Sequence, residues 1–164
     1  MSRYDLFSHV STNFTGFVSP RGILFDGSNI WVTDSLWLKK LDSNGNILQS
    51  VFLDSEGQSP VFDGSNIWVP GRAPSSLSVV RARDGMLLTF FTGNGLNEPK
   101  QAAFDGQRIL VTNAGGGLSV WKAADLTPIG VFSTSPFAAA GACSDGTSFW
   151  VTMGGSGFFT LGRY

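Results

Sequence analysis

An eight-residue sequence, Phe-Asp-Gly-Ser-Asn-Ile-Trp-Val, occurs twice without change, at residues 25–32 and 62–69. Looser copies occupy residues 104–111 (FDGQRILV) and 144–151 (SDGTSFWV). The Asp-Gly pairs of the four copies are separated by 37, 42 and 40 residues. A period of this size is typical of repeat architectures, in which each unit buries its apolar surface only by stacking on its neighbours. The repeat therefore constrains the fold more strongly than any single motif in the chain.

Each copy predicts a β-hairpin, because an Asp-Gly turn signal precedes a run of β-branched and aromatic residues. In the first unit, strands are expected at residues 22–25, 30–33, 36–41 and 47–53. Four strands in about 40 residues is the size of one propeller blade. The Ala- and Gly-rich run at 138–142 has helical propensity, but the repeat register places it as the first strand of the fourth unit.

These units predict an all-β, four-bladed β-propeller with four antiparallel strands per blade. It forms one domain over residues 1–164, with blades at about 20–53, 58–91, 99–132 and 137–164. The fourth unit lacks its last strand. We expect the N-terminal segment 2–10 to complete that blade by pairing with residues 158–163, which would remove two open sheet edges. A second arrangement, in which two chains form one eight-bladed ring or stack face to face, stays open.

The strand patterns indicate blades that are covered on both faces. Trp31, Trp68 and Trp150 share one repeat position within continuous apolar runs, so they are predicted to pack between blades. Trp37 and Trp121 lie on third strands at unrelated positions, where stacking on a sugar or a partner is an alternative to packing. The innermost strands carry small residues, which would fit near the axis of a ring with few blades.

Composition excludes several classes of function. The net charge of -1 offers no electrostatic basis for binding nucleic acid or an anionic membrane. Charged residues make up 14%, below the usual figure of about 25%, which suggests that a partner or another subunit covers part of the surface. The single Cys143 excludes an intrachain disulfide and is expected to be a structural thiol. No segment resembles a signal peptide or a membrane span, so a cytoplasmic or particle-associated location is expected.

The first unit, with its pattern P-x-G-x-x-F-D-G-x-x-I-W-V-T-D-S…K-L-D-x-x-G from Pro20 to Gly45, resembles bacterial β-propeller repeats of the streptogramin lyase, NHL and YVTN group. The resemblance implies blades but little about function, because such repeats serve many roles. Members usually have six or seven blades, so four is a departure. The lyase member uses a catalytic histidine and a divalent metal. The only histidine here is His9, which we place in an outer strand, and no residue takes over that role.

Other motifs predict turns rather than chemistry. Asp26, Asp63, Asp105 and Asp145 each begin a hairpin turn and are not expected to bind metal. The segment 42–46 departs from a calcium loop in its glycine position and lacks the downstream glutamate. Three glycines at 115–117 are not followed by the Lys-Ser/Thr of a phosphate loop. The sequence predicts no catalytic residue, metal or cofactor.

A binding site is expected where loops gather on the rigid scaffold. In a propeller, the connections between blades and the loops between second and third strands emerge on one face. The candidate ligand-binding residues on this face are Arg21, Asp34, Trp37, Glu56, Arg72, Asn113 and Met153.

The leading hypothesis is a non-enzymatic binding or assembly module for a protein or glycan, acting as a monomer or homodimer. The alternatives are a lyase- or hydrolase-like enzyme with a divalent metal, and a structural component of a phage or surface assembly. The assignment as an enzyme is left open, with the absence of a catalytic constellation favouring a non-enzyme.

Overall fold

The computed structural model describes residues 1–4 and 11–164, and it is built from antiparallel strands. Four successive sheets, named blades 1 to 4, follow the sequence repeat. Blade 1 contains β3 (Pro20–Phe25), β4 (Ile30–Asp34), β5 (Trp37–Leu41) and β6 (Ile47–Phe52). Blade 2 contains β7 (Val61–Phe62), β8 (Asn66–Gly71), β9 (Ser76–Arg81) and β10 (Met86–Phe91). Blade 3 contains β11 (Pro99–Phe104), β12 (Arg108–Asn113), β13 (Leu118–Lys122) and β14 (Pro128–Phe132). Blade 4 contains β15 (Ala138–Ser144), β16 (Phe149–Gly155) and β17 (Phe158–Arg163).

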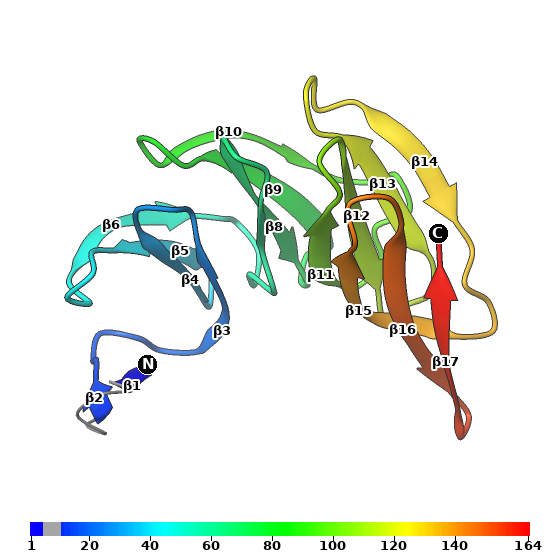
Figure 1. The fold of residues 1–164 in the computed structure, drawn as a ribbon, viewed down its shortest axis with the longest axis horizontal. Coiled ribbons are helices and arrows are strands. Elements are labelled where there is room, and N and C mark those ends of the chain that lie inside the picture. Colours follow the sequence, from blue (N-terminus) through cyan, green and yellow to red (C-terminus); the bar gives the residue numbers. More distant parts are fainter. Residues whose placement is uncertain (5–10) are drawn as a thin grey trace.

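Each blade is a meander in which consecutive strands pair antiparallel. The four blades follow one another along an open arc, with blade 1 at one end and blade 4 at the other (Figure 1). The prediction of an all-β fold made of four propeller blades is therefore confirmed, and residues 138–142 belong to a strand as expected. Among the residues that the structure describes, no helix is long and apolar enough to cross a membrane.

The prediction that the N-terminal strand completes blade 4 is wrong for the part that the structure describes. β1 (Ser2–Tyr4) pairs with β2 (Ser11–Asn13) in a separate hairpin, while residues 5–10 of the predicted strand lie outside the described residues. The Arg3 guanidinium donates to the Ser43 carbonyl oxygen of blade 1 at 3.3 Å, and the two chain ends lie at opposite ends of the arc (Figure 1). A hairpin with a nearby segment costs less loop-closure entropy than pairing with β17.

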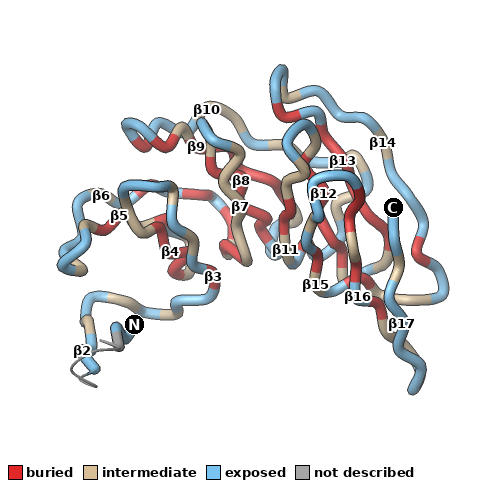
Figure 2. Tube along the Cα trace, in the orientation of Figure 1, coloured by how far each residue is buried: buried red, intermediate tan, exposed pale blue. Residues whose placement is uncertain are grey.

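Three apolar clusters hold the blades together, one at each junction. The cluster between blades 1 and 2 contains Trp31 and Ile67, and the cluster between blades 2 and 3 contains Trp68 and Trp121, all with no exposed surface. A third cluster, which includes Leu110, joins blades 3 and 4. Burial is concentrated in the middle strands of each blade, and the outermost strands are exposed (Figure 2). Trp121 is therefore a packing residue, whereas Trp37 is 41% exposed.

The repeated aspartates connect each turn to the core. The Asp26 carboxylate accepts hydrogen bonds from the backbone N–H groups of Ser28 and Asn29 at 2.8 and 2.6 Å, and from Trp31 Nε1 at 2.7 Å. Positive φ occurs at Gly27 but not at Asp26, so the connection is a four-residue turn built on the aspartate side chain rather than a two-residue type I′ turn.

The same arrangement recurs in the other blades. The indole nitrogens of Trp68 and Trp150 donate to Asp63 and Asp145 at 2.6 and 2.8 Å. In blade 3 a leucine replaces the tryptophan, and Arg108 Nε donates to Asp105 at 2.7 Å instead. The Asp-Gly repeat therefore encodes both the turn and its attachment to the face of the blade.

Protonation of the turn carboxylates Asp26, Asp105 and Asp145 is expected to destabilise the fold in acid. The hydrogen bond from Trp150 and those from the backbone N–H groups of Ser148 and Thr147 lower the pKa of Asp145 from 3.8 to about 2. Burial alone would raise the pKa of Asp105, but the hydrogen bonds from Arg108 and Gln107 outweigh it, and the pKa is lowered. A carboxyl with a lower pKa in the folded state stabilises the fold above the unfolded pKa and loses that contribution as pH falls through the folded pKa.

The melting temperature should therefore fall steadily between pH about 4 and pH about 2. Thermal melts followed by circular dichroism at constant ionic strength would measure this. The Asp145→Asn variant should show a shallower pH dependence than the natural chain. A melting temperature that does not change over this range would contradict the role of the turn carboxylates.

Candidate binding surface

Exposed charged side chains alternate in sign across the loop face of blades 1 to 3. Arg21 Nη2 lies 3.4 Å from Glu56 Oε2, and Arg72 Nη2 lies 3.8 Å from Glu98 Oε2. The Arg72 backbone N–H donates to the Glu56 carbonyl oxygen at 3.0 Å, which joins the two pairs. We call these four residues the charged row. Three of them are among the predicted site residues, and the structure brings those three together.

Glu98 is the member that the sequence analysis missed. It lies in the connection between β10 and β11, just as Glu56 lies in the connection between β6 and β7. Its backbone N–H donates to Ser75 Oγ in the loop between β8 and β9, at 3.0 Å. Its position in the sequence could have identified it. Glu98 immediately precedes the first strand of blade 3, and connections between blades were predicted to lie on this face.

The charged row is available to a partner. The side chains of its two pairs are between 39% and 52% exposed. Pairs this exposed contribute little to folding stability. Glu56 and Glu98 lie in connections between blades, Arg21 lies in β3, and Arg72 lies in the loop between β8 and β9. The blades therefore hold the four groups at defined positions.

Asp34 occupies a different environment from the one predicted. Its side chain is buried, and it accepts hydrogen bonds from Lys39 Nζ at 2.6 Å and from the backbone N–H groups of Val18 and Ser19. Burial by itself raises the pKa of Asp34, but these hydrogen bonds outweigh it and the pKa is lowered. The carboxylate holds the segment that enters blade 1 against β4, and it is not presented on the loop face.

Asn113 and Met153 are also internal. Asn113 accepts a hydrogen bond from the Asn97 backbone N–H at 3.1 Å and donates to Ser119 Oγ at 3.0 Å. Met153 packs in the core between blades 3 and 4, and its sulfur accepts a hydrogen bond from the Tyr164 hydroxyl at 3.3 Å. Both side chains are engaged within the fold, so a ligand-binding role for them stays a prediction that would require these contacts to break.

Trp37 lies on the outer face of blade 1, the side away from blade 2. Its ring meets that of Phe52 edge-on, with 5.3 Å between ring centroids. A shallow groove of about 360 Å³ beside it is also lined by Val18, Lys39 and Ser50. The seven predicted residues therefore divide into three on an exposed row, one on an exposed blade face and three in the interior.

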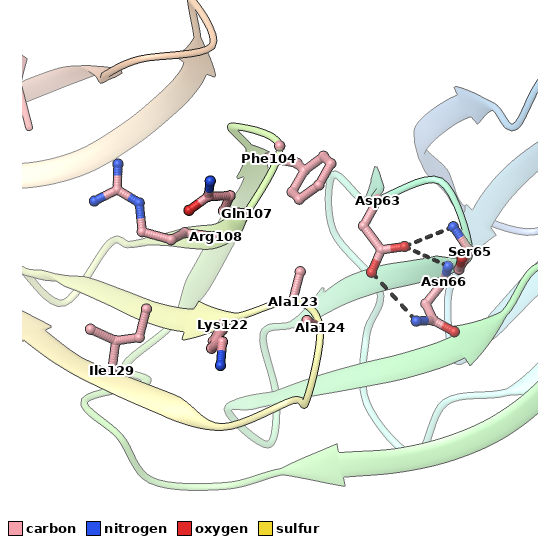
Figure 3. Close-up of a pocket in the computed structure, with 11 residues that line it drawn as sticks. Asp63, Ser65, Asn66, Phe104, Gln107, Arg108, Lys122, Ala123, Ala124 and Ile129 are labelled. Carbon is pink, nitrogen blue, oxygen red and sulfur yellow. Dashed lines mark hydrogen bonds between the residues drawn. The ribbon is translucent and has the colours of Figure 1, made fainter.

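The opposite face carries grooves between the turns of neighbouring blades. The groove between blades 2 and 3 has a volume of about 610 Å³, with Phe104 and Lys122 in its lining (Figure 3). A groove of about 410 Å³ between blades 1 and 2 has Phe62 and Arg81 at the corresponding positions. Both basic groups are already paired within their own blade, each at 2.8 Å from an aspartate. The two grooves are therefore equivalent features of the repeat, and their basic side chains are engaged in ion pairs within a blade.

Residues 1–4 and 11–164 contain no group of three or more His, Cys, Asp or Glu side chains that could hold a metal ion. His9, the residue considered for lyase chemistry, lies outside the described residues. The lyase- or hydrolase-like alternative stays a prediction.

Comparisons with known proteins define the class of the fold. No protein-family model and no curated protein sequence matches the chain. Solved structures match it at low identity. The RRP9 WD40 repeats align with a TM-score of 0.76 and 16% identity over 92% of this chain and 52% of that chain. Hydrazine synthase from Kuenenia stuttgartiensis aligns with a TM-score of 0.76 and 17% identity over 98% of this chain and 49% of that chain. The computationally designed Ika4 protein aligns with a TM-score of 0.78 and 14% identity over 93% of this chain and 94% of that chain.

The chain thus spans about half the length of the RRP9 and hydrazine synthase chains. WD40 repeats form β-propellers, so these similarities identify a β-propeller repeat fold. At this level of identity they show the fold alone. The more specific resemblance to streptogramin lyase, NHL and YVTN repeats stays a prediction.

Proposed function

We propose that this protein is a non-enzymatic interaction scaffold that binds a partner protein through the charged row. The observation that carries the proposal is the alternation of Arg21, Glu56, Arg72 and Glu98 across three blades. The fold does not require these exposed pairs for stability. Alternating charges at fixed positions favour one orientation of a partner with the complementary pattern and disfavour others. The likeness to WD40 repeats supports a protein-interaction role in general terms.

Reversal of two charges tests the proposal. Partners cross-linked to the purified chain would be identified by mass spectrometry, and their affinities measured for the natural chain and for the Arg21→Glu/Arg72→Glu variant. We expect the double variant to bind about tenfold more weakly or worse, because it places like charges opposite the partner. The affinity of the natural chain should also fall as salt is raised.

Arg83→Glu is the matched control. The side chain of Arg83 is 75% exposed in the turn between β9 and β10, outside the charged row. Both variants should melt close to the natural chain, since the altered groups are exposed. Equal loss of binding in the two variants, or no loss in either, would overturn the assignment of the charged row as the binding surface.

A glycan is the second candidate ligand, and Trp37 is the observation that favours it. The indole is 41% exposed beside a shallow groove, and such a ring can stack on the apolar face of a sugar. A glycan array probed with the natural chain and with Trp37→Ala would test this. Binding that disappears in Trp37→Ala but persists in the charge-reversed variant would favour the glycan over the protein partner.

A further inference from the structure

We propose that the outer face of blade 4 receives blade 1 of a second copy of this chain, so that two copies close one ring of eight blades. The proposal is independent of the ligand that the charged row binds. It rests on three positions of the repeat. In the earlier blades the side chains at these positions contact the next blade, and in blade 4 no blade in the described part of the chain covers them.

The first of these positions is the tryptophan of the repeat. Trp31 and Trp68, and Leu110 in blade 3, are at most 1% exposed because the next blade covers them. Trp150 has the same register and the same hydrogen bond to its turn aspartate, but it is only partly buried. A cationic side chain lies over the ring in blades 1 and 4. Lys40 Nζ is 5.1 Å from the centroid of the Trp31 ring, and the Arg163 guanidinium is 5.5 Å from that of Trp150.

The second position is a leucine on the third strand of each blade. Leu38 pairs with Thr33, Leu77 with Pro70 and Leu118 with Thr112, and none of these leucines is exposed. Leu161 pairs with Thr152 in the same register but is 59% exposed, and Phe159 beside it is 86% exposed. An apolar face of this kind on a folded domain marks an interaction site.

The third position is a threonine in blades 1, 3 and 4 and Pro70 in blade 2. In blades 1 and 3 the threonine hydroxyl joins adjacent blades. Thr33 Oγ1 accepts the Gly22 backbone N–H of its own blade and donates to the Gln58 carbonyl oxygen, on the segment entering blade 2, at 3.0 Å. Thr112 Oγ1 likewise donates to the Ala140 carbonyl oxygen of blade 4 at 2.7 Å. Thr152 Oγ1 accepts the Gly141 N–H at 2.9 Å in the same way. Within the described residues its hydroxyl donates only to the Gly141 carbonyl oxygen of its own blade, at 3.4 Å.

Blade 1 presents the complementary face. Its register places Ile23, Phe25, Trp37 and Phe52 on the side away from blade 2, and they are 59%, 60%, 41% and 47% exposed. The position of Ile23 corresponds to Ala102 and Ala142, which the preceding blade covers to 4% and 9% exposure. The segment that enters blade 1 occupies part of this face, where Val18 and Gly16 bond to Asp34 and Lys39. Among the residues that the structure describes, no blade covers the remaining apolar side chains of this face.

Strand order favours a second copy as the occupant. Each innermost strand is entered from the outer strand of the preceding blade: β6 leads to β7, β10 to β11 and β14 to β15. β3 is entered from β2, while among the described residues blade 4 has three strands, with β17 at its edge. Docking blade 1 of one copy on blade 4 of another brings β2 toward this edge. Two such contacts related by a two-fold axis close the ring and remove both open ends.

Light scattering coupled to size exclusion tests the proposal on the full chain. The natural chain should have twice the 17.5 kDa of one chain over a wide range of protein concentration. Leu161→Glu on blade 4 and Phe25→Glu on blade 1 should each reduce the mass to that of one chain, because each places a charge at the contact. Ile129→Glu is the matched control, since Ile129 is 50% exposed on the outer strand of blade 3, and it should leave the mass doubled.

Cys143 provides a second readout that does not depend on mass. It is exposed on the same face of blade 4, where it pairs with Trp150. A maleimide should react slowly with the natural chain and rapidly with Leu161→Glu. A single-chain mass at every concentration would overturn the proposal and leave Trp37 free for a glycan. A doubled mass that persists in Phe25→Glu would also overturn it, because the copies would then meet through other faces.

Discussion

Replacing Trp68 with alanine is expected to lower the free energy of unfolding by about 3–5 kcal/mol, the range for removing a large buried aromatic side chain. Trp68 has no exposed surface and lies in the core between blades 2 and 3, where its ring stacks on Phe91 with 6.4 Å between centroids. The substitution would leave a cavity at the junction and would deprive Asp63 of its indole donor. Urea unfolding followed by circular dichroism measures the change.

Two further variants separate the contributions of packing and hydrogen bonding. Asp63→Asn keeps an acceptor for Trp68 but removes the charge, and it should cost about 1 kcal/mol. Phe90→Ala removes an aromatic ring that is 51% exposed on the outer strand of blade 2, and it should cost less than about 1 kcal/mol. If Trp68→Ala costs no more than Phe90→Ala, the blades are not held together by the junction cores described above.

Replacing Asp34 with alanine is expected to cost about 3 kcal/mol, because it removes one partner of a buried ion pair. Lys39 Nζ would keep only its bond to the Gly16 carbonyl oxygen, and the backbone N–H groups of Val18 and Ser19 would lose their acceptor. Asp34→Ala combined with Lys39→Met should recover part of the loss, since no buried charge would remain. Urea unfolding of the two variants and the natural chain checks both expectations.

Asp84→Ala is the matched control, because its ion pair with Arg81 has a similar length but is exposed to solvent. It should destabilise the chain far less than Asp34→Ala. The Asp34→Ala result also bears on function. A large loss of stability would identify Asp34 as part of the fold, and a small loss would leave it free to act as the ligand-binding residue that the sequence suggested.

Repetition made the architecture predictable. The return of Phe-Asp-Gly-Ser-Asn-Ile-Trp-Val indicated identical units, and the register it set placed residues 138–142 in a strand against their helical propensity. Trp31 and Trp68 were correctly expected to pack between blades. Local sequence sufficed here because a strand, a turn and the next strand lie within a few residues of one another.

The candidate site was less predictable, because the sequence places a residue in a loop but not on a surface. Asp34 and Asn113 are the last residues of β4 and β12, next to the loops. Their short polar side chains turn inward and accept hydrogen bonds from backbone N–H groups of the segment that enters the blade. Arg21, Glu56 and Arg72 carry long side chains that reach solvent. Their alternation with Glu98 appears only once three blades are stacked.

The strand order, the turns and the packing of Trp31 and Trp68 could be predicted from the sequence, because they depend on contacts within a unit and on a pattern that the units share. The arrangement at the two ends of the array could not be predicted in this way. Residues 2–4 formed a hairpin with 11–13, and apolar side chains such as Phe25 on blade 1 and Phe159 on blade 4 were left exposed. Pairing between distant segments depends on the curvature of the whole stack, and no repeat unit contains that information.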